Sequence, residues 1–415
     1  MEYGCIGEKL THSFSKEIHA KLFDYKYELK ELARGDLDKF MRERDFKAIN
    51  VTIPYKQDVI PYLDFISDTA KDIGAVNTIV NRDGKLYGYN TDFSGLSALI
   101  KRLGVDIRDR NVYILGSGGT SKTAFAVAKS LGAKSVTRVS RTARDGCITY
   151  EQAYSEDVEF IINTTPCGMY PNIGEAPIDI TKFKNLCGVV DAVYNPLDSQ
   201  LVCDAKAVGI PAAGGLYMLV AQAAYAAEKF TDTDVPQEKI DSIFHDMFIT
   251  KQNIVLIGMP ASGKSTVGKR LAETLHRELI DTDSEIVKFA GKTIPEIFGS
   301  VGETGFRDIE SQVIAEISKR QNIIIATGGG AVLRRCNVEL LKQNGRVYFL
   351  DRPLEKLITT DDRPLSSNRA DLEKRYRERY SIYCDSADVK IDGAPDVETV
   401  ADRIKDDFLN ENTCY

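Results

Sequence analysis

Short apolar runs alternate with helix-like stretches along most of this 415-residue chain. Runs such as 111–115, 160–163 and 188–193 are bounded by polar or Gly-rich turns, a pattern that predicts buried strands. Strand, helix and Gly-rich turn recur from 111 to 215, and a longer helix is predicted over 216–230. The simplest structure for this part of the chain is a doubly wound parallel sheet.

The regions on either side also mix strands with helices. Residues 48–53, 75–80 and 86–89 are strand candidates and predict a small α/β layer near the N-terminus. A breaker-rich patch at 231–236 precedes a last amphipathic helix, and the border with the C-terminal half falls near 249–252. Because no long linker is present, we expect the two halves to sit close together.

A phosphate-binding pattern follows the apolar strand candidate 254–257. The spacing G-x-x-x-x-G-K-[ST] is carried by Gly258, Gly263, Lys264 and Ser265. The helix expected over 266–275 would point free backbone N–H groups at an anion, Lys264 would add positive charge, and Ser265 would offer a hydroxyl to magnesium. A chance Gly/Ser turn is the alternative, but strand, loop and helix stand in the required order.

Polar loops interrupt residues 1–100. They are 12–15 (HSFS), 50–56 (NVTIPYK), 74–78 (GAVNT) and 88–92 (GYNTD). Each alone is typical of a turn or a helix cap. Together they bring hydroxyls, amides, one lysine and one aspartate to strand ends, where they would surround a small polyhydroxy acid. Lys56 and Asp92 are then the candidate proton-handling pair.

A Gly-rich turn after the strand 111–115 predicts a dinucleotide site. The turn is GSGGTS at 116–121, with Ser121 where the pattern prefers a third Gly or Ala. The next strand leads to Arg141 and Arg144, where the ribose 2′ position of a bound dinucleotide would be recognised. Guanidinium groups there favour the 2′-phosphate of NADP over NAD, and a solvated charge run is the alternative.

Composition is that of an ordinary globular protein, with 43% hydrophobic and 28% charged residues. The net charge of −7 argues against non-specific nucleic-acid binding. Eight scattered cysteines without a CxxC pair, and four histidines, suggest neither a zinc site nor a disulfide framework. No apolar run approaches the roughly 18 residues of a membrane span, and no signal pattern opens the chain, so we expect no membrane partner and a cytoplasmic location.

Residues from about 1 to 249 resemble shikimate dehydrogenase. The resemblance rests on SFS, NVTIPYK, GAVNTI, GYNTD, GSGGTSK, SRT, NTTPCGM, DAVYNP and GGLYMLVAQA, which stand in the family's order. It implies that Lys56 and Asp92 are catalytic. For shikimate it implies a site made of Ser13, Ser15, Thr52, Asn77, Tyr194 and Gln222. For NADP it implies a site made of Gly116, Gly118, Gly119, Ser140, Arg141, Thr142, Arg144, Thr164, Gly215 and Met218.

Residues from about 252 to 410 resemble shikimate kinase, through the phosphate loop and the motifs DTD (281–283), GE and FR (302–307), GGGA (328–331) and RPL (363–365). The resemblance implies that ATP is bound by Gly258, Ala261, Ser262, Gly263, Lys264, Ser265 and Thr266. It also implies that shikimate is bound by Asp283, Arg307, Gly329, Gly330 and Arg379. Magnesium would be held by Ser265 and Asp281, and Lys264 would be catalytic.

The same resemblance makes Arg363 a catalytic group on the transferring phosphate, inside a lid over 354–372. The phosphate loop alone would also fit adenylate-type or gluconate-type kinases, so specificity rests on the other motifs. Ala261 replaces the glycine usual inside the loop, which is tolerable if this residue has a negative φ.

The predicted fold class is α/β, in three parts. An α/β substrate domain (1–100, completed by helices at about 216–249) is followed by a doubly wound Rossmann NADP domain (101–215) and a P-loop NMP-kinase-like α/β domain (251–415). The predicted enzyme of aromatic amino-acid biosynthesis reduces 3-dehydroshikimate with NADPH and then phosphorylates shikimate with ATP and magnesium.

Two alternatives remain open. One is an oxidoreductase of quinate catabolism joined to a kinase for another small acid. The other is a non-catalytic regulator built from degenerate enzyme folds, against which the intact Lys56, Asp92, Lys264, Asp281 and Arg307 argue. The sequence leaves the oligomeric state undetermined.

Overall fold

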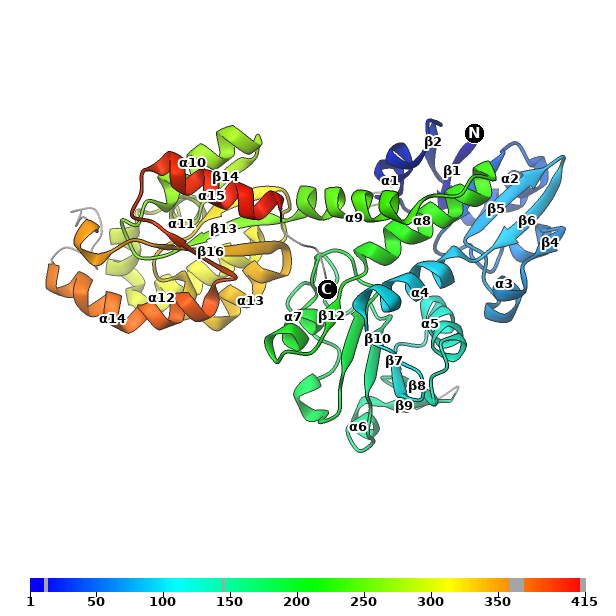
Figure 1. Cartoon of the computed structure of the whole chain (residues 1–415), viewed down its shortest axis with the longest axis horizontal. Coiled ribbons are helices and arrows are strands. Elements are labelled where there is room, and N and C mark those ends of the chain that lie inside the picture. The colour runs from blue at the N-terminus through cyan, green and yellow to red at the C-terminus, as the bar shows by residue number, and fades with distance from the viewer. Residues whose placement is uncertain (11–13, 144–145, 358–368, 411–415) are drawn as a thin grey trace.

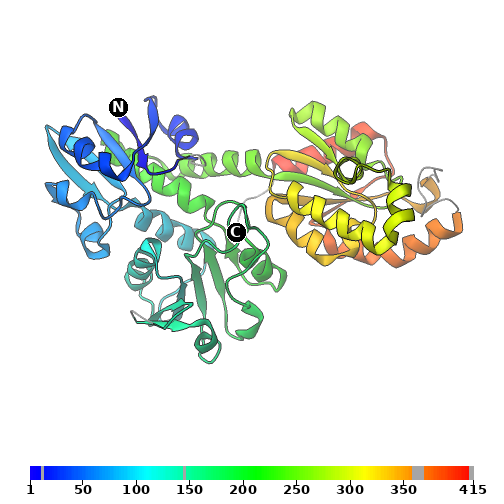
Figure 2. The same ribbon diagram turned by 180° about the vertical axis from the view of Figure 1, so that it is seen from behind.

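The described residues form three β-sheets that follow one another along the sequence (Figure 1). The computed structural model describes residues 1–10, 14–143, 146–357 and 369–410. Helix α9 (Gln237–Lys251) runs from the part that holds the first two sheets into the third (Figures 1 and 2). Within the described residues, no helix is long and apolar enough to cross a membrane.

The first sheet is mixed. Its strands are β1 (Tyr3–Gly7), β2 (Tyr27–Glu31), β3 (Ala48–Val51), β4 (Phe65–Ile66), β5 (Thr78–Arg82) and β6 (Lys85–Tyr89), and its helices are α1 (Ser15–Leu22), α2 (Leu37–Glu43) and α3 (Asp68–Ile73). The strand order is β2-β1-β3-β5-β6-β4. Strand β5 begins later than the expected residue 75, because the chain first turns out of α3 at Gly74, whose φ is 70°.

The second sheet is wholly parallel. Its strands are β7 (Asn111–Leu115), β8 (Ser135–Ser140), β9 (Cys147–Thr149), β10 (Phe160–Asn163), β11 (Gly188–Asp191) and β12 (Ala212–Ala213), and its helices are α5 (Gly119–Ser130), α6 (Tyr150–Ala153) and α7 (Gln200–Ala207). The order β12-β11-β10-β7-β8-β9 reverses direction at β7. This confirms the predicted doubly wound sheet, whose ligand crevice lies at such a reversal.

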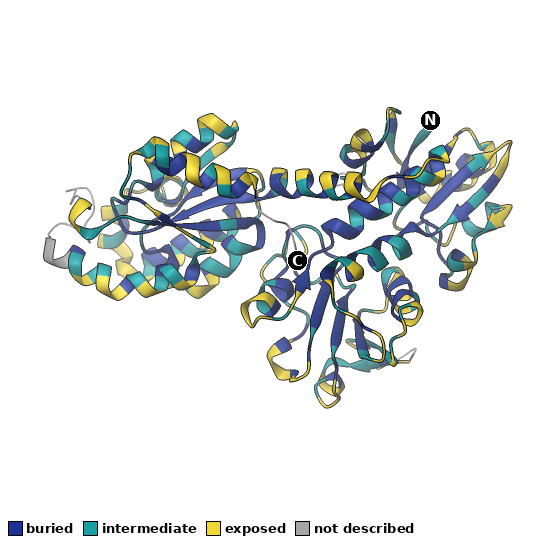
Figure 3. Cartoon of the chain, viewed as in Figure 1, coloured by how far each residue is buried: buried dark blue, intermediate teal, exposed yellow. Residues whose placement is uncertain are grey.

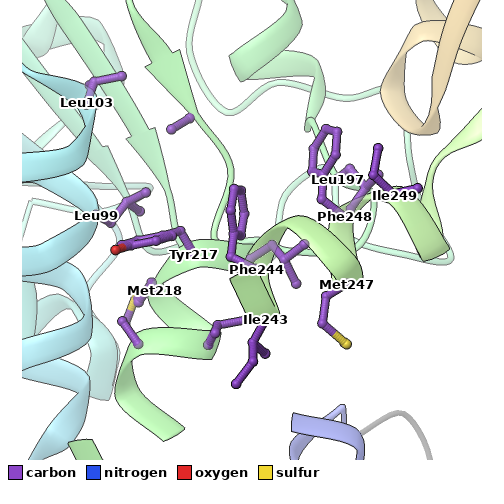
Figure 4. Close-up of a cluster of buried hydrophobic side chains, with 14 of the residues drawn as sticks. Leu99, Leu103, Leu197, Tyr217, Met218, Ile243, Phe244, Met247, Phe248 and Ile249 are labelled. Carbon is purple, nitrogen blue, oxygen red and sulfur yellow. The ribbon is translucent and has the colours of Figure 1, made fainter. Parts of the chain in front are cut away.

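Helices α4 (Thr91–Leu103) and α8 (Leu216–Thr231) pack against each other between the first two sheets. Their apolar side chains meet those of α9 in one buried cluster, which includes Leu99, Leu103, Tyr217, Met218, Ile243, Phe244, Phe248 and Ile249 (Figure 4). The same cluster continues through Ile254 and Leu256 into the third sheet. The two halves of the chain therefore share apolar packing, in agreement with the absence of a linker.

The third sheet is parallel and lies between helices. Its strands are β13 (Asn253–Ile257), β14 (Glu278–Asp281), β15 (Ile323–Ala326), β16 (Gly345–Asp351) and β17 (Val389–Asp392), and its helices are α10 (Lys264–Leu275), α11 (Thr282–Ala290), α12 (Ile294–Ile317), α13 (Arg335–Asn344), α14 (Arg369–Ser386) and α15 (Val397–Leu409). The order is β14-β15-β13-β16-β17. The central strand β13 is buried along its whole length, as its uninterrupted apolar run predicts (Figure 3).

Candidate active sites

The first site is a cleft of about 500 Å³ between the first sheet and the start of α8. Most side chains predicted to bind a polyhydroxy acid line it, namely Ser15, Thr52, Lys56, Asn77, Asp92, Tyr194 and Gln222. Gly215 and Met218, predicted for the cofactor, line the same cleft. Ser13 lies outside the described residues. The loops that were separate in sequence thus meet at one place.

Lys56 and Asp92 form an ion pair inside this cleft, with 2.5 Å between Nζ and Oδ2. Asp92 stands in the first turn of α4, where the helix dipole favours its negative charge. The two side chains are 27% and 16% exposed, so the pair is partly shielded and still open to the cleft. A lysine and a carboxylate at this distance can hold and pass on a single proton.

A buried hydrogen-bond network fixes the amide of Asn77. Its Nδ2 donates to Thr91 Oγ1 at 3.1 Å and to Gln222 Oε1 at 3.4 Å, and its Oδ1 accepts from Thr91 N at 2.7 Å. Asn50 extends the network by donating to Thr78 Oγ1 at 3.2 Å. Sequence reasoning did not single out Asn50, Thr78 or Thr91, although each stands inside a quoted motif. Their function as supports depends on pairing across strands, which spacing along the chain does not reveal.

The wall of the cleft behind this network is electrically neutral. Burial raises the pKa of the Cys5 thiol to about 12, and nearby Lys56 only partly offsets this rise. Burial lowers the pKa of His19 to about 3, although a hydrogen bond with Asn50 opposes the shift. Both groups are uncharged at neutral pH, so neither adds a charge next to Lys56 and Asp92.

The Gly-rich turn after β7 has room for a pyrophosphate. Gly116 has a φ of 110°, and a Cβ there would lie 2.8 Å from Thr164 Oγ1, so glycine is required. A Cβ at Gly118 or Gly119 would meet nothing within 4 Å, which leaves open space beside the N-terminus of α5. Ser121 replaces the third glycine of the pattern and is buried, and its hydroxyl is satisfied there because Oγ donates to Gly118 O at 2.6 Å.

The predicted 2′-phosphate residues follow β8 on the same edge of the sheet. Gly116 N donates to Val139 O at 2.8 Å, which places the Gly-rich turn beside the end of β8. Ser140 Oγ donates to Thr142 O at 2.5 Å, and Arg141 is exposed. Arg144 lies outside the described residues. An exposed guanidinium at this edge suits a phosphate, so the donor set fits NADP.

The phosphate-binding loop leads from β13 into α10. Lys264 is 7% exposed, and its Nζ donates to the backbone oxygens of Gly258 at 2.9 Å and Met259 at 2.8 Å. Ser265 Oγ donates to Asp281 Oδ2 at 2.7 Å, so the two predicted magnesium ligands lie side by side. Oxygen donors in this arrangement fit a magnesium ion bound next to nucleotide phosphates.

Ala261 does not have the expected negative φ. Its φ is 63°, in the left-handed region, while the neighbouring Ser262 donates its backbone N–H to Met259 O at 3.1 Å. The loop therefore turns tightly at Ala261, where glycine would be less strained. The replacement is accommodated in a strained conformation.

Two buried arginines face the Gly-rich turn after β15. Arg307 and Arg379 are each 8% exposed. Arg307 packs so closely on Gly330 that any side chain at Gly330 would collide with its guanidinium. Arg379 Nη1 donates to Gly329 O at 3.1 Å. The arginines thus approach one turn from α12 and α14.

The same turn adjoins Asp283 and the phosphate loop. A Cβ on Gly328 would lie 2.6 Å from Asp283 Oδ1, and one on Gly329 would lie 2.7 Å from Pro260 Cδ. The predicted substrate residues Asp283, Arg307, Gly329, Gly330 and Arg379 therefore lie together beside the nucleotide loop. Arg363 and most of the predicted lid lie outside the described residues.

Sequence reasoning missed Glu310, which lies beneath Arg307. Glu310 is fully buried and accepts from Arg307 Nη1 at 2.7 Å. Burial raises the pKa of Glu310, and the positive charge of Arg307 opposes the rise. The spacing of three residues on a helix was the available signal, since it places both side chains on one face.

Comparison with known proteins finds a family match in each half of the chain. The family model for the shikimate dehydrogenase substrate binding domain matches residues 5–79, and that for shikimate kinase matches residues 260–408. A shikimate dehydrogenase (NADP(+)) of Clostridium beijerinckii is 39% identical over 266 residues, which cover 59% of this chain and 98% of the relative.

Two solved structures are similar to the N-terminal part. The chorismate mutase/shikimate 5-dehydrogenase fusion protein of Clostridium acetobutylicum has a TM-score of 0.56 and 36% identity, over 59% of this chain and 96% of that chain. Shikimate 5-dehydrogenase of Thermus thermophilus, in complex with NADP(H) and shikimate, has a TM-score of 0.54 and 26% identity, over 59% and 99% of the two chains.

Proposed function

We propose, on the premise that this chain belongs to the shikimate dehydrogenase family and carries a shikimate kinase domain after it, that its two sites act in succession on one hydroxyl group. The enzyme joins an NADP-dependent shikimate dehydrogenase to a kinase that uses ATP and magnesium. The first site would reduce the C3 ketone of 3-dehydroshikimate, and the second would phosphorylate the resulting alcohol. The observation that carries the proposal is the Lys56–Asp92 pair in a cleft lined by hydroxyls and amides.

In the dehydrogenase site, the chain would bind the substrate and manage one proton. Bound NADPH supplies the hydride here, as bound ATP with magnesium supplies the phosphoryl group to the kinase site. Lys56 and Asp92 would deliver a proton to the ketone oxygen as C3 accepts the hydride. Asn77, Gln222 and Ser15 would hold the remaining hydroxyls and the carboxylate.

The proposed cofactor residues extend from this cleft along the carboxyl edge of the second sheet. The N-terminus of α5, at Gly118 and Gly119, would accept the pyrophosphate, and Arg141 would pair with the 2′-phosphate. Gly215 and Met218 line the substrate cleft as well, which supports a nicotinamide position next to Lys56.

In the kinase site, the buried arginines would pair with the substrate carboxylate. Asp283 would accept a hydrogen bond from the attacking hydroxyl and orient it. Lys264 would turn from the backbone oxygens it now contacts toward the outer phosphates. Ser265 and Asp281 would hold the magnesium ion.

We also propose the division into a substrate domain (1–100 with the helices at about 216–249), an NADP domain (101–215) and a kinase domain (251–415), which the three separate sheets support. The cysteines of the described residues are free thiols, which supports a cytoplasmic location. The net charge of −7 supports small molecules rather than nucleic acid or membranes as partners.

The test of the proposed function is one assay with 3-dehydroshikimate and NADPH, to which magnesium-ATP is added later. We expect NADPH consumption first, and ADP release that depends on the first substrate. NADPH consumption without ADP release would overturn the kinase assignment. If quinate is turned over equally well, or NAD is preferred, the quinate alternative replaces this proposal, and turnover of neither cofactor favours a regulator.

Two lysine variants separate the sites. Lys56→Ala should lower dehydrogenase kcat by about 10²-fold or more and leave the kinase unchanged, because only the first reaction uses its proton. Lys264→Ala should abolish phosphoryl transfer and leave NADPH oxidation unchanged. Lys134→Ala, at an exposed position, is the matched control. Loss of both activities in either site variant would contradict independent sites.

A further inference from the structure

Lys251 is the last residue of α9, at the junction between dehydrogenase and kinase. Its backbone oxygen accepts from Asn322 N at 3.3 Å, immediately before β15 of the kinase. Arg277, which follows α10, donates to the backbone oxygens of Ile249 at 2.7 Å and Gln252 at 2.6 Å. The kinase therefore fixes the backbone on both sides of Lys251.

The side chain of Lys251 contacts Glu17 and Phe14, which are neighbours of residues that line the dehydrogenase substrate cleft. Its Nζ donates to Glu17 Oε2 at 3.0 Å and lies 4.5 Å from the ring centre of Phe14. The Phe14 ring packs on Tyr194, with 5.4 Å between centroids. Ser15 follows Phe14 in the chain, and both Ser15 and Tyr194 line the cleft. Lys251 thus supports one wall of the substrate site.

The contact is partly shielded, and its charges suit both helices. The side chain of Lys251 is 18% exposed and that of Glu17 is 37% exposed. Glu17 stands in the first turn of α1 and Lys251 in the last turn of α9, so each charge opposes the partial charge of its own helix end. The aromatic ring of Phe14 adds a cation–π attraction.

We propose that Lys251 is a positioning residue of the dehydrogenase substrate site, contributed by the junction with the kinase. The inference rests on the proposed function, since the ligand is taken to be 3-dehydroshikimate. Lys251 acts through Glu17 and Phe14, which hold the first turn of α1 and therefore Ser15 against the cleft. The Lys56–Asp92 pair lies after β3 and at the start of α4, so loss of Lys251 should weaken substrate binding and spare the chemical step.

The test is Lys251→Met in the full chain, with both reactions measured. We expect the KM for 3-dehydroshikimate to rise about threefold at saturating NADPH, as for a partly exposed ion pair with an added ring contact. The dehydrogenase kcat and the kinase parameters should stay the same. Exchange of the two charges, in Glu17→Lys with Lys251→Glu, should restore only part of the affinity, because the ion pair returns while the ring contact with Phe14 is lost and each charge then stands at the unfavourable end of its helix.

Lys239→Met is the matched control. Lys239 lies on α9 too, donates to Leu22 O, and lies 5.2 Å from the ring centre of Phe23, so it joins the same two helices away from the cleft. Its loss should leave the KM unchanged. An equal rise in KM for Lys239→Met would overturn the inference, because general packing would then explain the effect.

An unchanged KM in Lys251→Met would also overturn it. If that variant folds poorly, Glu17→Gln removes the same ion pair from the other side and keeps the contact with Phe14, so a smaller rise in KM is expected. Failure of the inference and failure of the proposed function are distinguishable. If the wild type is active and the KM of Lys251→Met is unchanged, only the role of Lys251 is contradicted. If the wild type does not reduce 3-dehydroshikimate, the proposed function is contradicted and this inference with it.

Discussion

At the scale of single residues, Ala261 shows a local cost inside the phosphate-binding loop. An L-residue in the left-handed region is destabilised by about 1–2 kcal/mol relative to its ordinary conformation. Ala261, with a φ of 63°, carries this cost. The loop conformation is set by its contacts: Ser262 N–H bonds to Met259 O, and Lys264 bonds to Gly258 O and Met259 O.

Ala261→Gly should therefore stabilise the kinase. The relief of strain exceeds the extra entropy of glycine in the unfolded chain, for a net gain of about 0.5 kcal/mol. The measurement is the urea concentration that halves kinase activity, which should rise. Ala272→Gly, in the interior of α10, should destabilise the kinase by about 1 kcal/mol and lower this concentration, because its φ is helical. A lowered midpoint for Ala261→Gly would show that the methyl group has a packing role.

The residues proposed to touch ligands were more predictable than those that support them. Lys56, Asp92 and Lys264 stand in short motifs that already indicate their chemistry, and the resemblance to shikimate kinase adds Asp281. Glu310 and Lys251 contact no ligand in the proposed site, and each acts on a partner that the fold supplies. A single sequence therefore predicts candidate contact residues but not the residues that support them.

At the scale of elements, β11 and α7 meet at the buried carboxyl group of Asp191. Burial raises its pKa from 3.8 to about 6, although hydrogen bonds from Ser199 and Asn163 oppose the rise. Ser199 Oγ donates to Asp191 Oδ2 at 2.6 Å, and Asn163 Nδ2 donates to Oδ1 at 2.9 Å. The protonated carboxyl group is therefore favoured in the folded state relative to the unfolded chain.

This raised pKa makes the second sheet less stable as the pH rises. Asp191 contributes stability that is fully present below pH 3.8 and is lost as the pH passes about 6. Between about pH 4.5 and 7 the loss is about 2 kcal/mol. The Asp191→Asn variant should not show this loss. The loss of stability is measured by hydrogen exchange of the β11 amides, corrected for intrinsic rates. An equal pH dependence in the wild type and in Asp191→Asn would contradict the prediction.

Strands buried on both faces were predictable, whereas edge strands were not. The apolar runs of β7, β10 and β13 match the structure because central parallel strands exclude polar residues. Strands β4, β9 and β12 have only two or three residues and carry no periodic signal. Their pairing depends on neighbours far along the chain, which sequence patterns do not specify.

At the scale of the whole molecule, the amino ends of the third sheet face the dehydrogenase. Lys251 O accepts from Asn322 N just before β15, and Asn344 Oδ1 accepts from Leu197 N at 3.0 Å just before β16. Gln321 Nε2 donates to Asn195 Oδ1 at 3.2 Å in the same region. All strands of the sheet are parallel, so their carboxyl ends, with the phosphate loop, lie at the opposite edge.

This polarity separates the two active sites by at least the length of the sheet. Strand β13 has five residues and spans about 17 Å at the usual rise per residue. The proposed kinase site therefore lies at the edge of the third sheet far from the dehydrogenase, and we expect shikimate to pass through solvent from one site to the other. Fusion in one chain means that the two enzymes are made in equal amounts. The contacts of Lys251 join their structures, and we expect no channel for shikimate between the two sites.

We therefore predict that shikimate made by the first site mixes fully with shikimate in solution. Labelled 3-dehydroshikimate would be converted with NADPH and magnesium-ATP in the presence of unlabelled shikimate. The label in shikimate 3-phosphate should fall in proportion to the unlabelled pool, and ADP release should begin after a lag that added shikimate abolishes. The Lys264→Ala variant mixed with Lys56→Ala should give the same label fraction as the wild type. A wild-type product that retains more label than the product of this mixture would contradict the prediction. It would mean that the two sites of one molecule exchange substrate directly, in spite of the direction of the third sheet.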